Sequence, residues 1–333
     1  MKELFEYHGG LHLRETVLWF DAPSPRQLCF ISNANVPGAS GHQKVLATDR
    51  TVETLRAMGA AHGRGRRVHE PQALVSPCGR PFALGQLSLE LFPSGFVLGG
   101  ASLLVKHAGR SIVYAGNINP RTPPGGLVER LEARSCDILV LPCPFGRRRH
   151  VFPPFEQTAA ALERFVRDTL EREVTPVLFC APLGEAQVVL HLLSEAGLPS
   201  RVHRRVFAAT RVYRDAGRPV GETRQFPPGA TPEAVIWPLS LYESQALQRL
   251  GQVSRALVSG LALDDELKRK MGCDAAFAIS CHADYPGHLE YVKACKPEQV
   301  VLTHGANREI KQDLEALGMK VTSVGPPQQM TRV

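Results

Sequence analysis

The stretch that decides the fold reads Ser-Cys-His-Ala-Asp at residues 280–284 and Val-Val-Leu-Thr-His-Gly at residues 300–305. Apolar runs predict a strand that leads into the first segment, over residues 275–280, and another that opens the second, over residues 300–303. The alternating β-α-β rhythm predicts a helix between them, over residues 286–295. Polar side chains therefore follow two strands of an alternating strand–helix segment, which is where functional sites gather in α/β folds.

The chain upstream predicts a sheet-rich region in which short β-forming runs are each bounded by Gly, Pro, Asn or Asp. An early helix is expected over residues 50–61, with Thr48 or Asp49 as its N-cap. A second helix, over residues 127–134, leads into a strand over residues 138–141. The other strands expected in this region are 17–20, 28–32, 45–48, 87–92, 102–106 and 111–115.

The middle of the chain has a different pattern, in which longer helices alternate with buried strands. Helices are predicted over residues 155–173, 184–196 and 208–216, and strands over residues 177–180, 235–238 and 256–259. The Gly-, Pro- and Arg-rich segment 217–231 is expected to be a loop. This alternation predicts a parallel α/β domain, inserted over residues 151–265 into a discontinuous domain made of residues 1–150 and 266–333.

The composition excludes several classes of protein. The chain has 333 residues, of which 44% are hydrophobic and 21% are charged, as in globular proteins. No apolar run reaches the roughly 18–20 residues of a membrane-spanning helix, and the first residues lack the apolar core of a signal peptide. The eight cysteines contain no Cys-x-x-Cys pair, and most lie in apolar runs. We therefore expect buried thiols and a cytoplasmic protein.

Several short motifs follow one another in a definite order. They include Leu-Trp-Phe-Asp at 18–21, Pro-Ser-Gly at 93–95, Tyr-Ala-Gly at 114–116 and Leu-Gly-Glu-Ala-Gln at 183–187. With the segment 280–305, they resemble the metallo-β-lactamase superfamily, in the nucleic-acid-processing branch with a β-CASP insertion. The type resembled is that of bacterial exonuclease-like proteins associated with DNA ligase or RNA processing. The resemblance covers nearly the whole chain and implies an α/β fold, an αββα sandwich interrupted by a parallel α/β domain.

The resemblance also implies a site for two zinc ions, and the chain departs from it at almost every ligand. The family motif His-x-His-x-Asp-His falls on Asn33, Asn35, Pro37 and Gly38. The positions of a further metal histidine, the bridging carboxylate and another acidic residue are occupied by Phe96, Asn117 and Pro142. The residues that match are the metal ligand His304, the accessory His282 and the structural Asp21.

These replacements bear directly on catalysis. Zinc needs about four N, S or O ligands, and hydrolysis needs an open coordination position for an activated water. Amides are poor ligands, Pro and Gly offer no side-chain ligand, and the Phe96 ring is apolar. We therefore expect no metal cofactor. The leading hypothesis is a catalytically inactive homologue that acts as a nucleic-acid-binding or structural subunit, beside an active nuclease or another repair or processing subunit.

Two other functions remain open. A divergent metal-dependent exonuclease or hydrolase could use a displaced site, and a Cys–His nucleophile is a variant of that idea. Small core residues also account for buried cysteines such as Cys281. The residues that a displaced site would recruit are His42, Cys143, Cys281, His282 and His304. The chain could instead be a protein-interaction scaffold without nucleic-acid affinity.

Basic residues indicate DNA or RNA as the partner. The net charge is +7, and nine of the 39 basic residues are Lys, which leaves 30 Arg. Arg suits bidentate phosphate contacts, although GC-rich codon usage and a solvated surface also account for Arg runs. The residues predicted to bind nucleic acid are Arg147, Arg148 and Arg149, at the family's domain junction, and Arg201, Arg204 and Arg205 in the insertion. A third cluster is Arg64, Arg66 and Arg67. Against this, Glu185 replaces a basic residue that the family has at a helix start.

Overall fold

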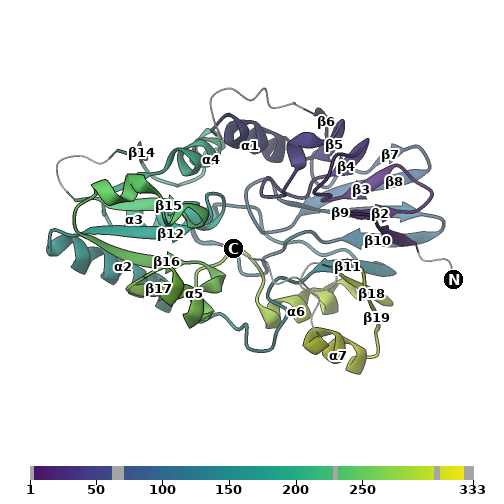
Figure 1. The fold of residues 1–333 in the computed structure, drawn as a ribbon. Helices are drawn as coiled ribbons and strands as arrows, with labels where there is room; N and C mark the ends of the chain where they lie inside the picture. The colour runs from purple at the N-terminus through teal and green to yellow at the C-terminus, as the bar shows by residue number, and fades with distance from the viewer. Residues whose placement is uncertain (1–3, 62–70, 228–231, 304–307, 326–333) are drawn as a thin grey trace. The chain divides into compact units, whose positions relative to one another are not determined.

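The computed structural model of the chain describes residues 4–61, 71–227, 232–303 and 308–325. The chain divides into two compact units (Figure 1). Unit 1 consists of residues 1–122, 128–151 and 282–333, and unit 2 of residues 123–127 and 152–281.

The first sheet of unit 1 has six strands in sequence order. They are β1 (Phe5–Tyr7), β2 (Leu11–Leu13), β3 (Leu18–Phe20), β4 (Leu28–Phe30), β5 (Lys44–Ala47) and β6 (Gln72–Val75). The pairing is antiparallel from β1 to β3 and parallel from β3 to β6. Helix α1 (Asp49–Ala60) follows β5, and the Thr48 hydroxyl accepts a hydrogen bond from the Thr51 N–H. Of the two N-caps that the sequence allows, Thr48 and Asp49, the structure uses Thr48.

The second sheet of unit 1 has seven strands, in the order β19-β18-β11-β10-β9-β8-β7. Their bounds are β7 (Phe82–Leu84), β8 (Leu87–Pro93), β9 (Ala101–His107), β10 (Arg110–Tyr114), β11 (Ile138–Pro142), β18 (Gln299–Thr303) and β19 (Lys320–Ser323). Strands β10, β11, β18 and β19 are mutually parallel. Helices α6 (Tyr285–Cys295) and α7 (Arg308–Ala316) pack on one face of this sheet.

Three hydrophobic clusters define the layers of unit 1. The first joins inward-facing side chains of both sheets, such as Phe20, Phe30 and Leu103. A second packs the other face of the seven-stranded sheet against α6 and α7, and a third packs the six-stranded sheet against α1. Two sheets face to face with helices outside form an αββα sandwich, as the sequence predicts.

Unit 2 is built on a six-stranded sheet in the order β14-β13-β15-β12-β16-β17, in which every pair is parallel. The strands are β12 (Thr175–Cys180), β13 (Ser200–Val202), β14 (Arg224–Gln225), β15 (Ala234–Pro238), β16 (Val253–Val258) and β17 (Ala275–Phe277). The α-helices are α2 (Phe155–Glu171), α3 (Glu185–Glu195), α4 (Arg204–Asp215) and α5 (Asp265–Lys270). Central strand β12 is buried along its whole length, as expected for a parallel sheet covered on both faces.

Three local predictions differ from the structure. The inserted unit continues to Cys281 and not only to residue 265, because β17 pairs with β16. Residues 127–134 form no helix, since the Glu132 N–H donates to the Pro93 carbonyl and the chain follows the sheet. Helix α4 begins at Arg204 and not at residue 208, because the His203 ring accepts the Arg205 N–H and caps an earlier turn.

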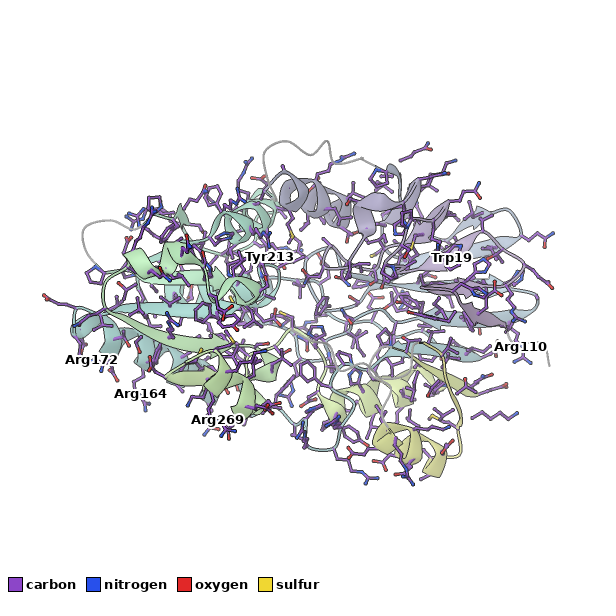
Figure 2. All side chains as sticks on the ribbon, in the orientation of Figure 1. Trp19, Arg110, Arg164, Arg172, Tyr213 and Arg269 are labelled. Atoms are coloured by element: carbon purple, nitrogen blue, oxygen red, sulfur yellow. The ribbon has the colours of Figure 1, made fainter. Side chains whose placement is uncertain are left out.

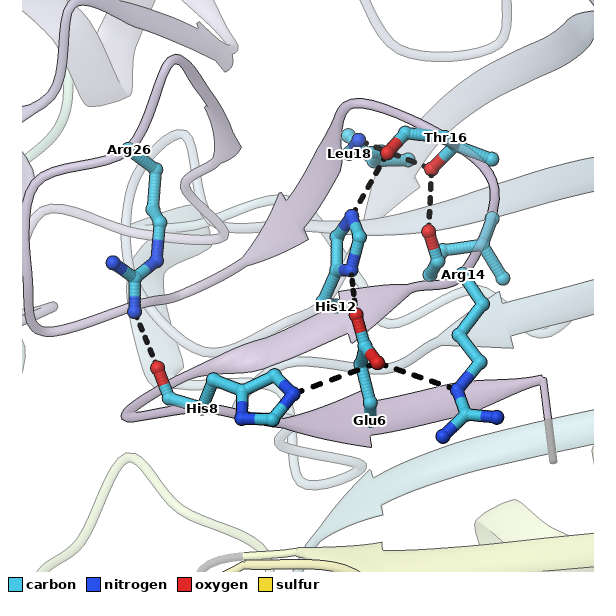
Figure 3. A network of polar contacts seen from close by, with 8 residues as sticks. Glu6, His8, His12, Arg14, Thr16, Leu18 and Arg26 are labelled. Atoms are coloured by element: carbon cyan, nitrogen blue, oxygen red, sulfur yellow. Dashed lines mark hydrogen bonds and ion pairs between the residues drawn. The ribbon is translucent and has the colours of Figure 1, made fainter.

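A polar cluster on β1 and β2 was missed by the sequence analysis (Figure 3). The Glu6 carboxylate lies 2.7 Å from His12 Nδ1 and 3.3 Å from Arg14 Nε. The His12 ring stacks on Trp19, and the Arg26 guanidinium lies 4.0 Å from the centre of the same indole. These contacts tie the first two strands to β3 on the outer face of the sheet.

None of the helices in the described parts of the chain combines the length and the hydropathy needed to cross a bilayer.

Candidate functional site

The loops that carry the predicted metal positions lie in unit 1, where they follow β4, β8, β10 and β11. Backbone hydrogen bonds connect them. The Asn119 N–H donates to the Ser94 carbonyl over 3.1 Å, and the Ala283 N–H donates to the Ile118 carbonyl over 2.7 Å. Segments far apart in the sequence are thus held as one group of loops.

Asp21 anchors the first of these loops. Its carboxylate accepts hydrogen bonds from the Ser32 N–H at 2.7 Å, the Ser32 hydroxyl at 2.5 Å and the Tyr114 hydroxyl at 3.0 Å. Burial raises the pKa of Asp21 to about 6, and the hydrogen bonds from Ser32 and Tyr114 act in the opposite direction. The Ser32 carbonyl in turn accepts the Ala101 N–H. This geometry gives Asp21 a structural role in positioning the loop.

The amide of Asn33 is satisfied within its own loop. The side chain is buried, its Nδ2 donates to the Ser32 hydroxyl at 3.0 Å, and its Oδ1 accepts the Asn35 N–H at 2.9 Å. The second bond closes an Asx turn, in which an Asn side chain substitutes for a backbone carbonyl. The side chains of Asn35 and Pro37 are exposed. The residues at the family's first metal positions therefore shape a turn.

Gly38 leaves no room for any side chain. Its φ is +76°, and a Cβ placed on it would lie 2.1 Å from the Pro23 carbonyl oxygen. That separation is far below van der Waals contact, so a ligand side chain at this position requires the backbone to move.

Phe96 contributes an apolar ring to a cluster of aromatic and imidazole side chains. Its ring centre lies 4.5 Å from that of His282, which lies 5.7 Å from that of Phe145. The Phe145 ring also makes an edge contact with His150, with the ring centres 5.5 Å apart. Burial lowers the pKa of His282 to about 4 and also lowers the pKa of His150. Both imidazoles are therefore neutral at pH 7.

The remaining predicted positions are distributed as follows. Asn117 is half-buried after β10, and Pro142 is buried at the end of β11, opposite Thr303 of β18. His304, the retained metal ligand, lies outside the described residues, as do Arg64, Arg66 and Arg67.

His288 is a buried imidazole that the sequence analysis did not single out. It lies on α6, is 1% exposed, and neither ring nitrogen has a hydrogen-bond partner among the described residues. Burial lowers its pKa to about 3, with a smaller contribution from His282. Its position inside a short helix with mixed polarity provides no signal in the sequence.

The residues proposed for a displaced site have other roles here. His42 is buried, and its Nδ1 accepts the Arg26 N–H at 3.0 Å. Cys143 and Cys281 are buried, and burial raises the pKa of both thiols, which disfavours the thiolate that metal binding and nucleophilic attack require. In the part of the chain that the structure describes, no three His, Cys, Asp or Glu side chains are grouped so that they could hold a metal ion.

The family's two zinc ions do not fit these residues. The donors at the first loop are one amide engaged in a turn and one exposed amide, Gly38 is packed against a carbonyl, and Phe96 is an apolar ring. A dinuclear zinc centre needs several N, S or O ligands converging on each ion.

Comparison with known proteins finds two similarities. A family model described as RMMBL, the Zn-dependent metallo-hydrolase RNA specificity domain, matches residues 273–322. A protein of Opitutus terrae (strain DSM 11246 / JCM 15787 / PB90-1) called "Probable DNA ligase" is 30% identical over 328 residues. The match covers 98% of this chain and 31% of that protein, so the chain spans about a third of the relative's length. Over residues 273–322 the chain is similar to Zn-dependent metallo-hydrolases, which agrees with the resemblance of its motifs to the metallo-β-lactamase/β-CASP superfamily.

The first Arg cluster, Arg147 to Arg149, lies in unit 1, and one of its side chains is engaged in an ion pair. The Arg148 N–H donates to Glu309, and its guanidinium donates to both carboxylate oxygens of Asp313. These contacts raise the pKa of Arg148 and, with a hydrogen bond from Tyr285, lower that of Asp313. Arg147 is half-buried and Arg149 is exposed. Nucleic-acid binding by this cluster stays a prediction.

The second cluster, Arg201, Arg204 and Arg205, lies in unit 2, and its members differ in exposure and in partners. Arg201 forms an ion pair with Glu233, and its Nη1 donates to the Pro227 carbonyl. Arg204 is exposed, whereas Arg205 is half-buried, and burial with the neighbouring Arg204 lowers its pKa. Arg201 therefore contributes to the local fold, and Arg204 is the member of the cluster that extends into solvent.

Glu185 occupies the β-CASP helix start where the family has a basic residue, and it is buried. Its carboxylate lies 3.4 Å from the Cys281 N–H, which donates to it. Burial raises the pKa of Glu185 to about 7, while the backbone hydrogen bonds oppose this shift. The side chain tethers the end of unit 2 and presents no cation to a ligand.

Proposed function

We propose that this protein is a catalytically inactive metallo-β-lactamase/β-CASP homologue that binds nucleic acid and works beside a DNA ligase. The observation that carries the proposal is the content of the family's metal positions. Phe96 lies against His282, and Gly38 lies against Pro23, where imidazole and carboxylate ligands would otherwise converge. Without a metal-bound hydroxide or a Lewis acid, this family's route to phosphodiester cleavage is lost.

The nucleic-acid role is supported by the comparisons and by charge. One match is to an RNA specificity domain, and the relative that aligns along 98% of the chain is called a DNA ligase. The chain has an excess of basic residues, with 39 Lys and Arg against 32 Asp and Glu. Positive charge supplies sequence-independent affinity for a phosphate backbone. Because the relative joins such a chain to further sequence under one name, a DNA ligase is the partner we favour over an active nuclease.

Three measurements on the purified full chain test this function. Elemental analysis should find well under one zinc per chain after expression with zinc in the medium. Single-stranded and duplex DNA and RNA with labelled ends should stay intact in the presence of Zn²⁺, Mn²⁺ or Mg²⁺. Titrations with the same oligonucleotides should show binding that weakens steeply with salt.

A matched variant separates loss of metal from damage during purification. Phe96→His restores one imidazole at the family's position and should acquire no zinc, since the other ligands are still missing. Stoichiometric zinc in the wild type together with metal-dependent cleavage would establish a divergent hydrolase instead. Intact oligonucleotides that also fail to bind at low salt would favour the protein-interaction scaffold. Co-purification from the native host then identifies the partner, and recovery without any ligase contradicts that part of the proposal.

A further inference from the structure

Helix α4 concentrates the positive charge of unit 2. It carries four Arg and one Asp in twelve residues, whereas α2 carries two Arg and four acidic residues in seventeen. The wider segment 201–224 holds seven Arg and two acidic residues, a formal charge of +5 in a chain whose net charge is +7. Helix α4 itself carries a formal charge of +3, whereas the flanking Arg201 and Arg224 are paired with Glu233.

The arginines of α4 are ordered by the helical repeat. Val206, Ala209, Val212 and Tyr213 are buried, and they define the face that packs onto the unit. At 100° per residue, Arg204 and Arg211 lie opposite that face, two turns or about 10.5 Å apart along the axis. Arg214 follows one turn later, and all three side chains are exposed.

These three side chains differ in their partners from Arg148, Arg201 and Arg224. Arg148 is paired with Asp313, and Arg201 and Arg224 share the buried carboxylate of Glu233. Among the described residues, the guanidinium groups of Arg204, Arg211 and Arg214 have no hydrogen bond or ion pair. The first turn of α4 contains Arg204 and Arg205 and no acidic residue. Their positive charge is unfavourable there, because it lies beside the positive end of the helix dipole. An anion bound along this face would pair with these guanidinium groups and would offset the positive charge at the helix N-terminus.

The chemistry of the face selects a polyphosphate over a protein. Protein interfaces centre on aromatic or aliphatic anchors, whereas the apolar residues of this face, Phe207 and Ala208, are half-buried and leave the guanidinium groups as its exposed part. Guanidinium groups bind phosphate oxygens with paired hydrogen bonds, and three of them along one helix face can contact more than one phosphate of a polyanion. We propose that the solvent face of α4, defined by Arg204, Arg211 and Arg214, binds the phosphate backbone of DNA or RNA. This inference rests on the proposed nucleic-acid role and locates it.

The test uses the full chain and a triple variant, R204Q/R211Q/R214Q. Fluorescence anisotropy gives the dissociation constant for single-stranded and duplex oligonucleotides at several salt concentrations. Each lost phosphate contact reduces the slope of log K against log salt by about 0.7–0.9, so the triple variant should lose about 2–3 from the slope. The loss should be similar for unrelated sequences, because phosphate contacts carry no base information.

A charge-matched control distinguishes a site from a general field. R164Q/R172Q/R269Q removes three exposed arginines from α2, its C-terminal end and α5 of the same unit (Figure 2). It should keep nearly the wild-type slope. All six side chains are exposed, so circular dichroism spectra and thermal midpoints of both variants should match the wild type.

The outcomes separate this inference from the proposed function. If the wild type binds with a steep salt dependence and the α4 variant retains that slope, the α4 face is excluded while nucleic-acid binding stands. Equal losses of salt slope in both triple variants would show that the positive charge of unit 2 acts as a whole, and would exclude a specific site on the α4 face. A wild type that binds no oligonucleotide overturns both ideas. Loss of retention on polyglutamate, with unchanged oligonucleotide binding, would assign the face to an acidic polypeptide and overturn the proposal.

Hydrogen exchange provides an independent readout on the unmodified chain. Amides of α4 and of the turn at His203 should gain protection when a single-stranded oligonucleotide is added, and those of α2 should not. Protection confined to unit 1 would contradict the assignment.

Discussion

The strand-end loops of unit 1 and helix α4 of unit 2 use their polar side chains in opposite ways. In unit 1 the Asn33 amide is used within a turn, and Phe96 covers His282, so little is left to meet a ligand. On α4 the guanidinium groups of Arg204 and Arg211 extend into solvent without partners among the described residues. The comparison shows that one chain can enclose its polar groups in one region and leave them exposed in another. In our proposal the first region has lost its chemistry and the second keeps the means of binding.

The largest expected effect is on the filled metal position. Phe96→Ala removes a ring that is 1% exposed, and the cavity should lower the free energy of unfolding by about 3–5 kcal/mol. Urea denaturation measures the loss, and Phe96→Leu, which keeps most of the apolar volume, should lose less. An unchanged urea midpoint in Phe96→Ala would mean that the ring contributes nothing to packing. The contrast between packed loops in unit 1 and exposed arginines on α4 would then weaken.

The next effect concerns the turn at Gly38. Gly38→Ala should cost about 1–2 kcal/mol for a left-handed backbone and about 1–3 kcal/mol more for the overlap with the Pro23 carbonyl. Gly79→Ala is the matched control, since its φ is +74° and no atom lies within 4 Å of the added Cβ. The difference between the two thermal midpoints isolates the overlap. Equal midpoints would show that position 38 tolerates side chains, including metal ligands.

A smaller loss is expected at Asp21. Asp21→Ala leaves the buried Tyr114 hydroxyl and the Ser32 N–H without their acceptor, which should cost about 1–3 kcal/mol. The pKa of Asp21 is raised to about 6, so the folded chain holds a proton that the unfolded chain releases above about pH 4. This contribution to stability is complete below pH 4 and is lost as the pH rises to 6.

Stability measured across pH 4–6 checks that sign. The wild type should become less stable through this window, and Asp21→Asn, which does not titrate, should show a flatter profile. A wild-type profile that rises instead would indicate that the hydrogen bonds from Ser32 and Tyr114 outweigh burial.

The smallest effect is expected for Arg148→Gln. Its ion pair with Asp313 is exposed, and exposed pairs contribute little to stability. Because Asp313 already occupies the guanidinium, oligonucleotide affinity should stay close to that of the wild type, in contrast to Arg204→Gln. A larger loss of affinity in Arg148→Gln than in Arg204→Gln would move the interface from unit 2 to unit 1.

Much of the architecture is readable in the sequence because it depends on local patterns. Alternating apolar runs and caps such as Thr48 located most strands and helices within a few residues. The short strands β1, β2, β7 and β13 were missed, since three residues carry too little periodicity to stand out. The helix expected over residues 127–134 failed because long-range pairing of Glu132 with Pro93 outweighed a weak helical preference.

Residue identity alone was enough to show that Asn, Pro, Gly and Phe stand where a zinc site would need histidines and carboxylates. The sequence also indicated an alternating α/β segment and the Arg-rich segments, because each of these is a property of neighbouring residues. Which arginines are engaged depended on the tertiary structure, since the partners Asp313 and Glu233 lie 165 and 32 residues from Arg148 and Arg201. The same holds for the pKa values of Asp21, Glu185 and His282, which follow from burial that only packing creates. Ligand chemistry is carried by single residues, whereas charge pairing and desolvation arise from contacts between distant ones.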